Sequence, residues 1–253
     1  MAHEDDSGPE HDTYPPAYVA KLVHELRTPL TALRGSLGLL ASVVDEASPE
    51  VKNFAAIAER NASRLAGMLD DLAELERFRS GGIAAGHESA DIQDVVDAAV
   101  FGAQALAEQA GVSVDASVDA GVIATDGALF KNLLSRILSY AIRMSGPSTP
   151  VRVRARREDG LTVLEVSDSG KRTDIADGHE VFDPFSLAAR RGQDPSARPG
   201  LGLAIARAIA ELIGATLTFT MTEGGGVFRI GIPGEPRIGS RDPGLGTPDH
   251  TSG

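Results

Sequence analysis

The sequence of 253 residues contains no cysteine and no tryptophan, and only 4% of its residues are aromatic. Without cysteine there is no disulfide, no thiolate metal ligand and no cysteine nucleophile, which excludes a small disulfide-stabilised domain and fits a reducing compartment. No stretch approaches the roughly 18 apolar residues of a membrane span, and the acidic start MAHEDDSGPEHD lacks the basic residues of a signal peptide. We therefore expect a soluble, cytoplasmic protein with no membrane span.

Basic side chains are also in deficit, since 24 Lys and Arg face 36 Asp and Glu and give a net charge of −12. This sign disfavours nucleic acid as a partner, because neutralising phosphates supplies most non-specific affinity for it. The charge is uneven, however. Residues 81–135 carry one basic and eight acidic side chains, whereas residues 136–207 carry twelve basic and nine acidic ones. The second stretch could therefore hold a small anionic ligand.

Apolar residues make up 42% of the chain and lie in long periodic stretches, a composition typical of globular proteins. Its ends differ. Residues 1–16 hold five acids and three prolines, and residues 234–253 hold five glycines and three prolines, so we expect both to be flexible tails. The length between them allows one or two domains with hydrophobic cores.

Residues 17–80 have the pattern of a helical hairpin. In the first helix, apolar residues recur at steps of three and four up to Val44. The segment DEASP then interrupts the pattern, and its Pro49 takes the first position of a second helix. The second helix ends at Ser80-Gly81-Gly82. Two helices so closely joined lie antiparallel, and a second copy would complete their burial as a homodimeric four-helix bundle. Asn61, the polar exception, either fixes register or occupies an exposed edge. The two seams are Leu26, Leu30, Leu33, Leu37, Leu40 and Val44, then Phe54, Ile57, Asn61, Leu65, Met68, Leu72 and Leu75.

His24 lies off the apolar seam, because its neighbours one and two turns on, Thr28 and Thr31, are polar. It should face solvent near a kink that Pro29 introduces. An exposed histidine alone is most often only solvated. Here the Glu25 carboxylate is adjacent and the Thr28 hydroxyl is one turn away, an arrangement suited to a phosphoryl-accepting nucleophile.

The segment VHELRTPLT, residues 23–31, resembles the H-box of two-component sensor histidine kinases. The resemblance implies that His24 is phosphorylated on its imidazole and passes the phosphoryl group to an aspartate of a response-regulator receiver domain. It also implies that Glu25 is the base that activates His24, and that Thr28 helps a water molecule to hydrolyse the phosphorylated regulator.

Residues 81–233 mix helical and strand patterns and predict an α/β sandwich, which makes the whole chain α+β. Its order is similar to the ATP-binding domain of the same kinases, the GHKL or Bergerat fold shared with gyrase and the Hsp90 chaperones. We expect helices over 91–110, 127–144 and 202–213, and strands over 112–118, 151–157, 161–168, 216–222 and 227–232, with the hairpin turn Asp159-Gly160 between the second and third strands.

Three motifs of that ATP-binding domain are recognisable. VSDSG (166–170) matches the first half of the G1 box, whose aspartate accepts a hydrogen bond from the adenine amino group. VFDPF (181–185) matches the F-box with Phe182 and Phe185, and PGLGLAI (199–205) matches the G2 box, whose glycines let backbone N–H groups approach phosphate. The resemblance implies ATP and Mg²⁺ as cofactors, with the nucleotide held by Asp168, Gly170, Gly200 and Gly202.

Other positions depart from the family. Its N-box has two asparagines four residues apart that hold Mg²⁺ and phosphate, and here those positions are Arg136 and Tyr140, with Arg143 following on the same helix. A G1-box glycine is replaced by Arg172, and Arg198 stands where the G2 box usually opens with glycine. Magnesium requires oxygen ligands, which a guanidinium lacks. We therefore predict Arg136, Tyr140 and Arg143 as residues of an altered nucleotide site and no protein metal ligand.

Two explanations of these arginines remain open. Either the guanidiniums replace Mg²⁺ in neutralising a bound anion, or, as we favour, the site no longer forms a productive ATP complex. In the second case the arginines fill the site or pair with acids from residues 81–135.

The expected function is phosphoryl exchange between His24 and a receiver aspartate, as a phosphotransferase or phosphatase, with weak or absent autokinase activity. The alternatives are an active ATP-dependent autokinase with an arginine-rich site, and a non-catalytic dimeric scaffold or inhibitor of a two-component pathway.

Overall fold

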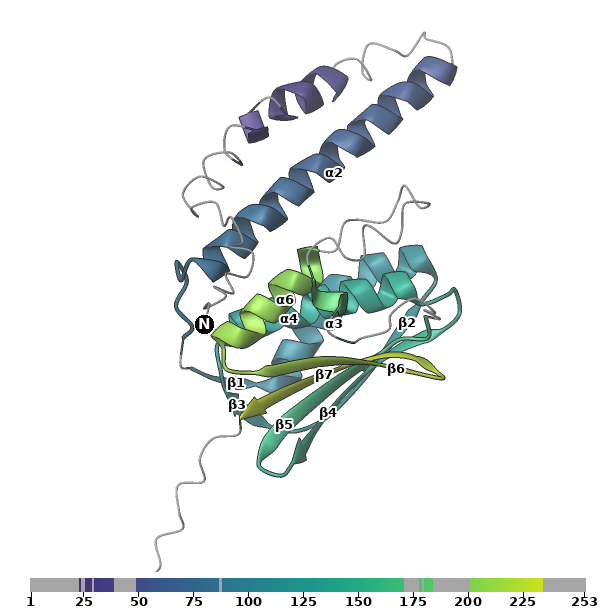
Figure 1. The fold of residues 1–253 in the computed structure, drawn as a ribbon. Helices are drawn as coiled ribbons and strands as arrows, with labels where there is room; N and C mark the ends of the chain where they lie inside the picture. The colour runs from purple at the N-terminus through teal and green to yellow at the C-terminus, as the bar shows by residue number, and fades with distance from the viewer. Residues whose placement is uncertain are drawn as a thin grey trace, which may run out of the picture.

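Figure 1 shows the computed structural model of the chain. It describes residues 23, 26–28, 30–38, 49–86, 88–170, 178, 180–183 and 201–233. Within them, no helical segment combines the length and apolar character that a bilayer crossing requires. Outside the described residues lie both predicted tails and His24, Glu25, Pro29, Arg172, Phe185, Arg198 and Gly200.

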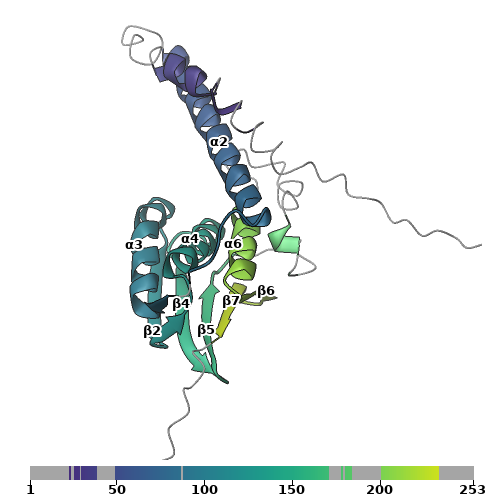
Figure 2. The ribbon, with the colours of Figure 1, turned by 90° about the vertical axis from the view of Figure 1, so that its left-hand side faces the viewer.

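Two helices project from an α/β domain (Figures 1 and 2). Helix α2, Pro49–Arg79, has 31 residues and runs back to the domain, and the helical residues 26–28 and 30–38 lie beside it. Pro49 begins α2, where a missing N–H costs no helical bond, and Gly81 follows its end with a φ of +70°. The predicted hairpin and the bounds of its second helix are confirmed.

The apolar seam of the hairpin divides into two parts. Leu72 and Leu75 of α2 pack with Phe78 in the core of the α/β domain, so the prediction that they line a helical bundle is corrected. Asn61 is exposed and donates to the carbonyl of Ile57 at 3.0 Å, which favours its interpretation as an edge residue. Among the described residues, the apolar seam residues that the single chain leaves exposed are Leu26, Leu33, Phe54, Ile57 and Leu65.

The domain is built on a five-stranded sheet in the order β2-β4-β5-β7-β6. Only β2 and β4 are parallel, and the other neighbours are antiparallel. Asp159 and Gly160 connect β4 to β5 with φ values of +46° and +84°, the two left-handed residues that a tight hairpin turn needs. The strands are β2 (Ser113–Asp119), β4 (Pro150–Glu158), β5 (Leu161–Ser167), β6 (Thr216–Thr222) and β7 (Gly225–Pro233).

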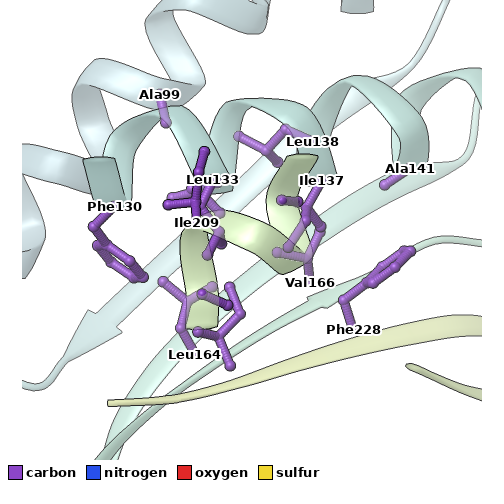
Figure 3. Close-up of a cluster of buried hydrophobic side chains, with 14 of the residues drawn as sticks. Ala99, Phe130, Leu133, Ile137, Leu138, Ala141, Leu164, Val166, Ile209 and Phe228 are labelled. Carbon is purple, nitrogen blue, oxygen red and sulfur yellow. The ribbon is translucent and has the colours of Figure 1, made fainter. Parts of the chain in front are cut away.

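Three helices cover one face of this sheet (Figures 1 and 2): α3 (Ile92–Ala110), α4 (Gly127–Met144) and α6 (Leu201–Leu212). Helix α4 presents a fully buried stripe that includes Phe130, Leu133 and Ile137. Figure 3 shows these side chains among those of the sheet, such as Leu164 and Phe228. The predicted helical hairpin followed by an α/β sandwich is confirmed.

Three short elements were not predicted from the sequence: β1 (Ser89–Asp91), β3 (Val122–Ala124) and the 3₁₀ turn η2 (Glu180–Phe182). Strands β1 and β3 pair only with each other. Three residues are too few to show an alternating pattern. Asp91 ends β1 and also caps α3, since its carboxylate accepts the N–H of Gln93 at 2.8 Å.

Candidate functional site

The first candidate site lies on an exposed part of the hairpin's first helix. Thr28 is exposed and, with Arg27, Thr31 and Ala32, lines a shallow surface depression. The Thr31 hydroxyl donates to the carbonyl of Arg27 at 2.8 Å, and the Arg27 guanidinium forms an ion pair with Asp70 of α2. Thr28 thus lies on a surface that another protein can reach. His24 and Glu25 fall outside the described residues.

The second candidate site begins at Asp168, directly after β5. Its side chain is buried, and Oδ1 accepts the N–H groups of Gly170 at 2.9 Å and Gly226 at 3.4 Å. The Asp168 N–H donates in turn to the carbonyl of Gly226 at 2.9 Å. Two donors on one oxygen offset part of the cost of burying a carboxylate. The predicted pair Asp168 and Gly170 is therefore brought together.

Gly225 and Gly170 lie where two stretches of backbone near Asp168 come too close for a side chain. A Cβ on Gly225, whose φ is +129°, would lie 2.0 Å from the carbonyl oxygen of Asp168. A Cβ on Gly170 would lie 2.5 Å from the carbonyl oxygen of Met144. Real Cβ atoms do not approach so closely, so both positions require glycine for the Asp168 carboxylate to stay where it is.

Tyr140 lies in an aromatic cluster of the core. Its ring meets Phe228 edge-to-face, with centroids 5.5 Å apart and an interplanar angle of 88°. Phe228 also contacts Phe182 and Phe219, with centroids 6.2 and 4.7 Å away. Packing of the ring therefore accounts for an aromatic residue at this position of α4.

Arg136 of α4 is bound to carboxylates of the hairpin. Its Nη1 lies 3.1 Å from Asp71 Oδ1 and its Nη2 lies 2.5 Å from Glu74 Oε2, both on α2. Its Nε donates to Asn132 Oδ1 at 3.2 Å, and Asn132 Nδ2 donates to Glu74 Oε1 at 2.9 Å. All three guanidinium nitrogens thus have partners. The prediction that the arginines pair with acids from residues 81–135 is wrong for Arg136. We call these four side chains, Asp71, Glu74, Asn132 and Arg136, the Arg136 network.

The guanidinium also lies beside Gly202, in the first turn of α6. A Cβ on Gly202 would stand 3.9 Å from Arg136 Nη1. The start of a helix is where backbone N–H groups bind phosphate, and here a protein cation is next to it. The network therefore brings two predicted site residues, Arg136 and Gly202, together.

Mg²⁺ does not fit these residues. The ion requires oxygen ligands in tight octahedral geometry, whereas Arg136 has none, the Asn132 oxygen accepts from Arg136, and the Tyr140 ring packs on Phe228. Among the residues that the structure describes, no group of three or more His, Cys, Asp or Glu could hold a metal. The Asp168 carboxylate is thus held in place by backbone N–H groups, whereas the side chains at the two expected metal positions do not fit Mg²⁺.

Much of the positive charge in residues 136–207 lies elsewhere. Arg152, Arg154 and Arg156 lie along β4, where they alternate with buried residues, and Arg152 and Arg154 are exposed. Arg156 donates to both Glu165 oxygens at 3.0 and 3.1 Å, and these bonds lower the pKa of Glu165. Arg143 is exposed and donates to the carbonyl of Ser139. Not all of the basic stretch of residues 136–207 therefore lies near Arg136, since these arginines follow a strand of the sheet.

Asp126 was not singled out from the sequence, although an aspartate directly before a helix is a typical N-cap. Its Oδ1 accepts the N–H groups of Ala128 and Leu129, both at 3.0 Å, and its Oδ2 accepts the N–H of Gly86 at 2.9 Å. The bonds from Leu129 and Gly86 lower the pKa of Asp126. This carboxylate joins the start of α4 to the segment that follows α2.

Comparison with known families gives two matches. Residues 17–81 match the family described as His Kinase A (phospho-acceptor) domain. Residues 125–236 match the histidine kinase-, DNA gyrase B- and HSP90-like ATPase family. The two matches correspond to the hairpin and to most of the α/β domain.

Characterised relatives cover both parts. The sensor protein KdpD of Escherichia coli is 34% identical over 225 residues, which are 86% of this chain and 24% of KdpD. The sensor protein DivL of Caulobacter vibrioides is 31% identical over 232 residues, 90% of this chain and 29% of DivL. The chain thus spans about a quarter of the length of these relatives.

Solved structures share the fold. Full-length ShkA in complex with AMPPNP has a TM-score of 0.70 at 21% identity, over 87% of this chain and 46% of that one. The Acinetobacter baumannii histidine kinase AdeS has a TM-score of 0.60 at 22% identity, over 84% of this chain and 98% of that one. With a phospho-acceptor hairpin followed by a GHKL-type ATPase domain, the chain belongs to the two-component sensor histidine kinase family.

Proposed function

We propose that this chain moves phosphoryl groups between His24 and the phosphorylated aspartate of a response-regulator receiver domain, while its own ATP-dependent autokinase activity is weak or absent. The H-box resemblance of residues 23–31 supports the first half of this proposal. The Arg136 network carries the second half. Where the family has a metal-binding amide, this chain has a cation already bound to Asp71 and Glu74.

Autophosphorylation depends on positioning and on neutralising the charge of the transferred group. The residues at the N-box positions supply neither, because Arg136 faces α2 and the Tyr140 ring packs on Phe228. Residual autokinase activity would then be far below that of a kinase with both asparagines. The adenine end, with Asp168 held by Gly170 and Gly226, can still contribute nucleoside affinity.

The chemistry assigned to the hairpin needs no nucleotide. An imidazole nitrogen of His24 attacks the phosphorus of the aspartyl phosphate, a P–N bond forms, and the P–O bond to the receiver breaks with the electron pair leaving on the carboxylate. Glu25, which follows His24, takes the imidazole proton. In the phosphatase direction the Thr28 hydroxyl orients a water molecule that attacks the same phosphorus, which releases inorganic phosphate and the free aspartate.

Dimerisation belongs to this proposal. The exposed seam residues Leu26, Leu33, Phe54, Ile57 and Leu65 form an apolar surface on the hairpin. A second hairpin would cover that surface in a four-helix bundle.

The test uses receiver domains phosphorylated with labelled acetyl phosphate and freed of the donor. A panel of purified receivers is incubated with the wild type, with His24→Ala, and with His87→Ala as a control histidine. We expect label on the wild type and on His87→Ala, or faster release of phosphate from the receiver, and no label on His24→Ala. Neither label on His24 nor accelerated release with any receiver would overturn the proposal.

A second candidate function, an active autokinase with an arginine-rich site, is favoured by the intact surroundings of Asp168. Titration calorimetry with ATP, with and without Mg²⁺, separates the two. Our proposal predicts weak or no binding and no dependence on Mg²⁺. Tight binding that requires Mg²⁺ would favour the autokinase.

A further inference from the structure

The Arg136 network joins parts of the chain that are far apart in sequence and belong to different domains. Asp71 and Glu74 are on the hairpin helix α2, and Asn132 and Arg136 are on α4 of the ATPase domain. The three charged side chains are partly shielded from water, with 18% of Arg136, 28% of Asp71 and 20% of Glu74 exposed. Ion pairs shielded to this degree are weakened by salt less than fully exposed ones are.

An apolar contact continues this polar one along α2. Leu75 and Phe78 of α2 are buried in the same core cluster as Leu203 and Ile205 of α6. Glu74 precedes Leu75, so the polar and apolar parts of the contact meet on one stretch of helix. Charged hydrogen bonds are directional, and the apolar side chains beside them are buried. Together they favour a single orientation of the ATPase domain relative to α2.

Asp70, the residue before Asp71, forms a similar ion pair with the first helix of the hairpin. Asp70 binds Arg27 of the hairpin's first helix, next to the exposed Thr28. Adjacent carboxylates of α2 therefore hold one arginine from the H-box helix and one from the ATPase domain.

We infer that Arg136 is an intramolecular latch. Its guanidinium, beside the first turn of α6, forms ion pairs with the carboxylates of Asp71 and Glu74, and these ion pairs hold the ATPase domain in one orientation on α2. A mobile ATPase domain serves a kinase that must carry ATP to its histidine. In the latched arrangement Thr28 of the H-box helix is exposed. This inference goes beyond the proposed function, since the orientation would be fixed whatever becomes of the phosphoryl group.

Distance measurement between spin labels tests the latch. Because the chain has no cysteine, Glu59→Cys on α2 and Ser117→Cys on β2, both exposed, give two unique labels. Labelled chains are mixed with excess unlabelled ones, so that each assembly holds at most one labelled copy. The wild type should give one narrow distance distribution.

The variants are Arg136→Glu, the charge swap Arg136→Glu with Glu74→Arg, and Lys131→Glu as a control on an exposed site of the same helix. We expect the distribution to broaden at least about twofold in Arg136→Glu, where like charges face each other, and to narrow again in the swap. Lys131→Glu should resemble the wild type.

A distribution unchanged in Arg136→Glu, or one that the swap leaves broad, would overturn the latch. Circular dichroism checks that each variant is folded. Should Arg136→Glu not fold, Asp71→Asn with Glu74→Gln removes the same contact from α2, and it must broaden the distribution for the inference to stand.

Discussion

The guanidinium of Arg136 has partners on all three of its nitrogens, and two of these partners are carboxylates of another domain. An asparagine at this position could not make these contacts, because it is shorter and uncharged. In our proposal, this one side chain contributes to the contact between the two domains instead of to metal binding. Arginine suits the second role because its donors are arranged as a rigid fork and its charge does not titrate.

Replacing this side chain should be costly. Arg136→Met keeps most of the volume but leaves Asp71 and Glu74 close together without a cation, so we expect the free energy of unfolding to fall by about 1–3 kcal/mol. Urea denaturation measures it. Lys131→Met, on an exposed position of α4, should change it by less than about 0.5 kcal/mol. Equal effects of the two changes would contradict the network.

Gly225 provides a second prediction at this scale. Gly225→Ala would place a Cβ 2.0 Å from the Asp168 carbonyl at a φ of +129°, so we expect a loss of about 3 kcal/mol or more in urea denaturation. Gly102→Ala is the matched control, because Gly102 lies within α3 with open space around it and alanine is the better helix former. That variant should gain about 0.5–1 kcal/mol. A mild effect at Gly225 would mean that the backbone around Asp168 is not held as described.

Helix α4 contacts the sheet, the helix α2 and the segment that follows α2. Its N-cap Asp126 binds the segment after α2, its buried stripe packs on the sheet, and Arg136 on the same helix reaches α2. Displacing α4 would therefore disturb the core and the domain contact together. Its capping carboxylate can be tested separately because it titrates.

The stability contributed by Asp126 should depend on pH. Hydrogen bonds from Leu129 and Gly86 hold its pKa below the ordinary value of 3.8. A depressed pKa in the folded state means that the contribution is complete above the unfolded pKa and is lost as the pH falls through the folded pKa. Asp126→Asn keeps one oxygen for the cap but has an amide nitrogen in place of the second, which cannot accept the N–H of Gly86, so it should cost about 1 kcal/mol at pH 7 and progressively less below pH 4.

Urea denaturation of both proteins between pH 2 and pH 7 measures this difference. Gly102→Ala, which removes no titratable group, is the control and should show no such trend. A cost at Asp126 that stays constant down to pH 2 would contradict the capping role.

How far the sequence predicts these elements depends on their length and surroundings. The bounds of α4 and β6 were predicted to the residue, because a buried stripe and an alternating strand leave clear periodic patterns. Leu72 and Leu75 were assigned to the wrong surface, since a heptad spacing is the same whether the helix faces a bundle or a domain. The partners of Arg136 on α2 are more than sixty residues away in the sequence. Their position depends on how the two domains pack together, which no local sequence pattern encodes.

For the molecule as a whole, the hairpin has two surfaces with different roles. The proximal part of α2 packs into the ATPase domain through Leu75 and Phe78, while the distal part leaves Phe54, Ile57 and Leu65 exposed. A long apolar stripe of this kind marks an interaction surface. In our account a second copy of the chain covers it.

Placing a charge on this stripe should separate the copies. Leu65→Glu buries a carboxylate in the bundle, so we expect its dimer dissociation constant in sedimentation velocity to rise at least about a hundredfold. Phe101→Glu changes an apolar residue on α3 that lies outside the hairpin and is even more exposed, at 79% against 51% for Leu65, and it should leave the dimer intact. A wild type that sediments as a monomer, or dimers equally affected by both changes, would contradict the bundle.

The source of the phosphoryl group on His24 tests the central claim most directly. Wild-type protein is incubated in parallel with labelled ATP and Mg²⁺ and with labelled phosphorylated receiver, and acid-labile, base-stable label is counted against His24→Ala. We predict label that depends on His24 from the receiver and little or none from ATP. Rapid labelling of His24 by ATP, with none from any receiver, would contradict the account.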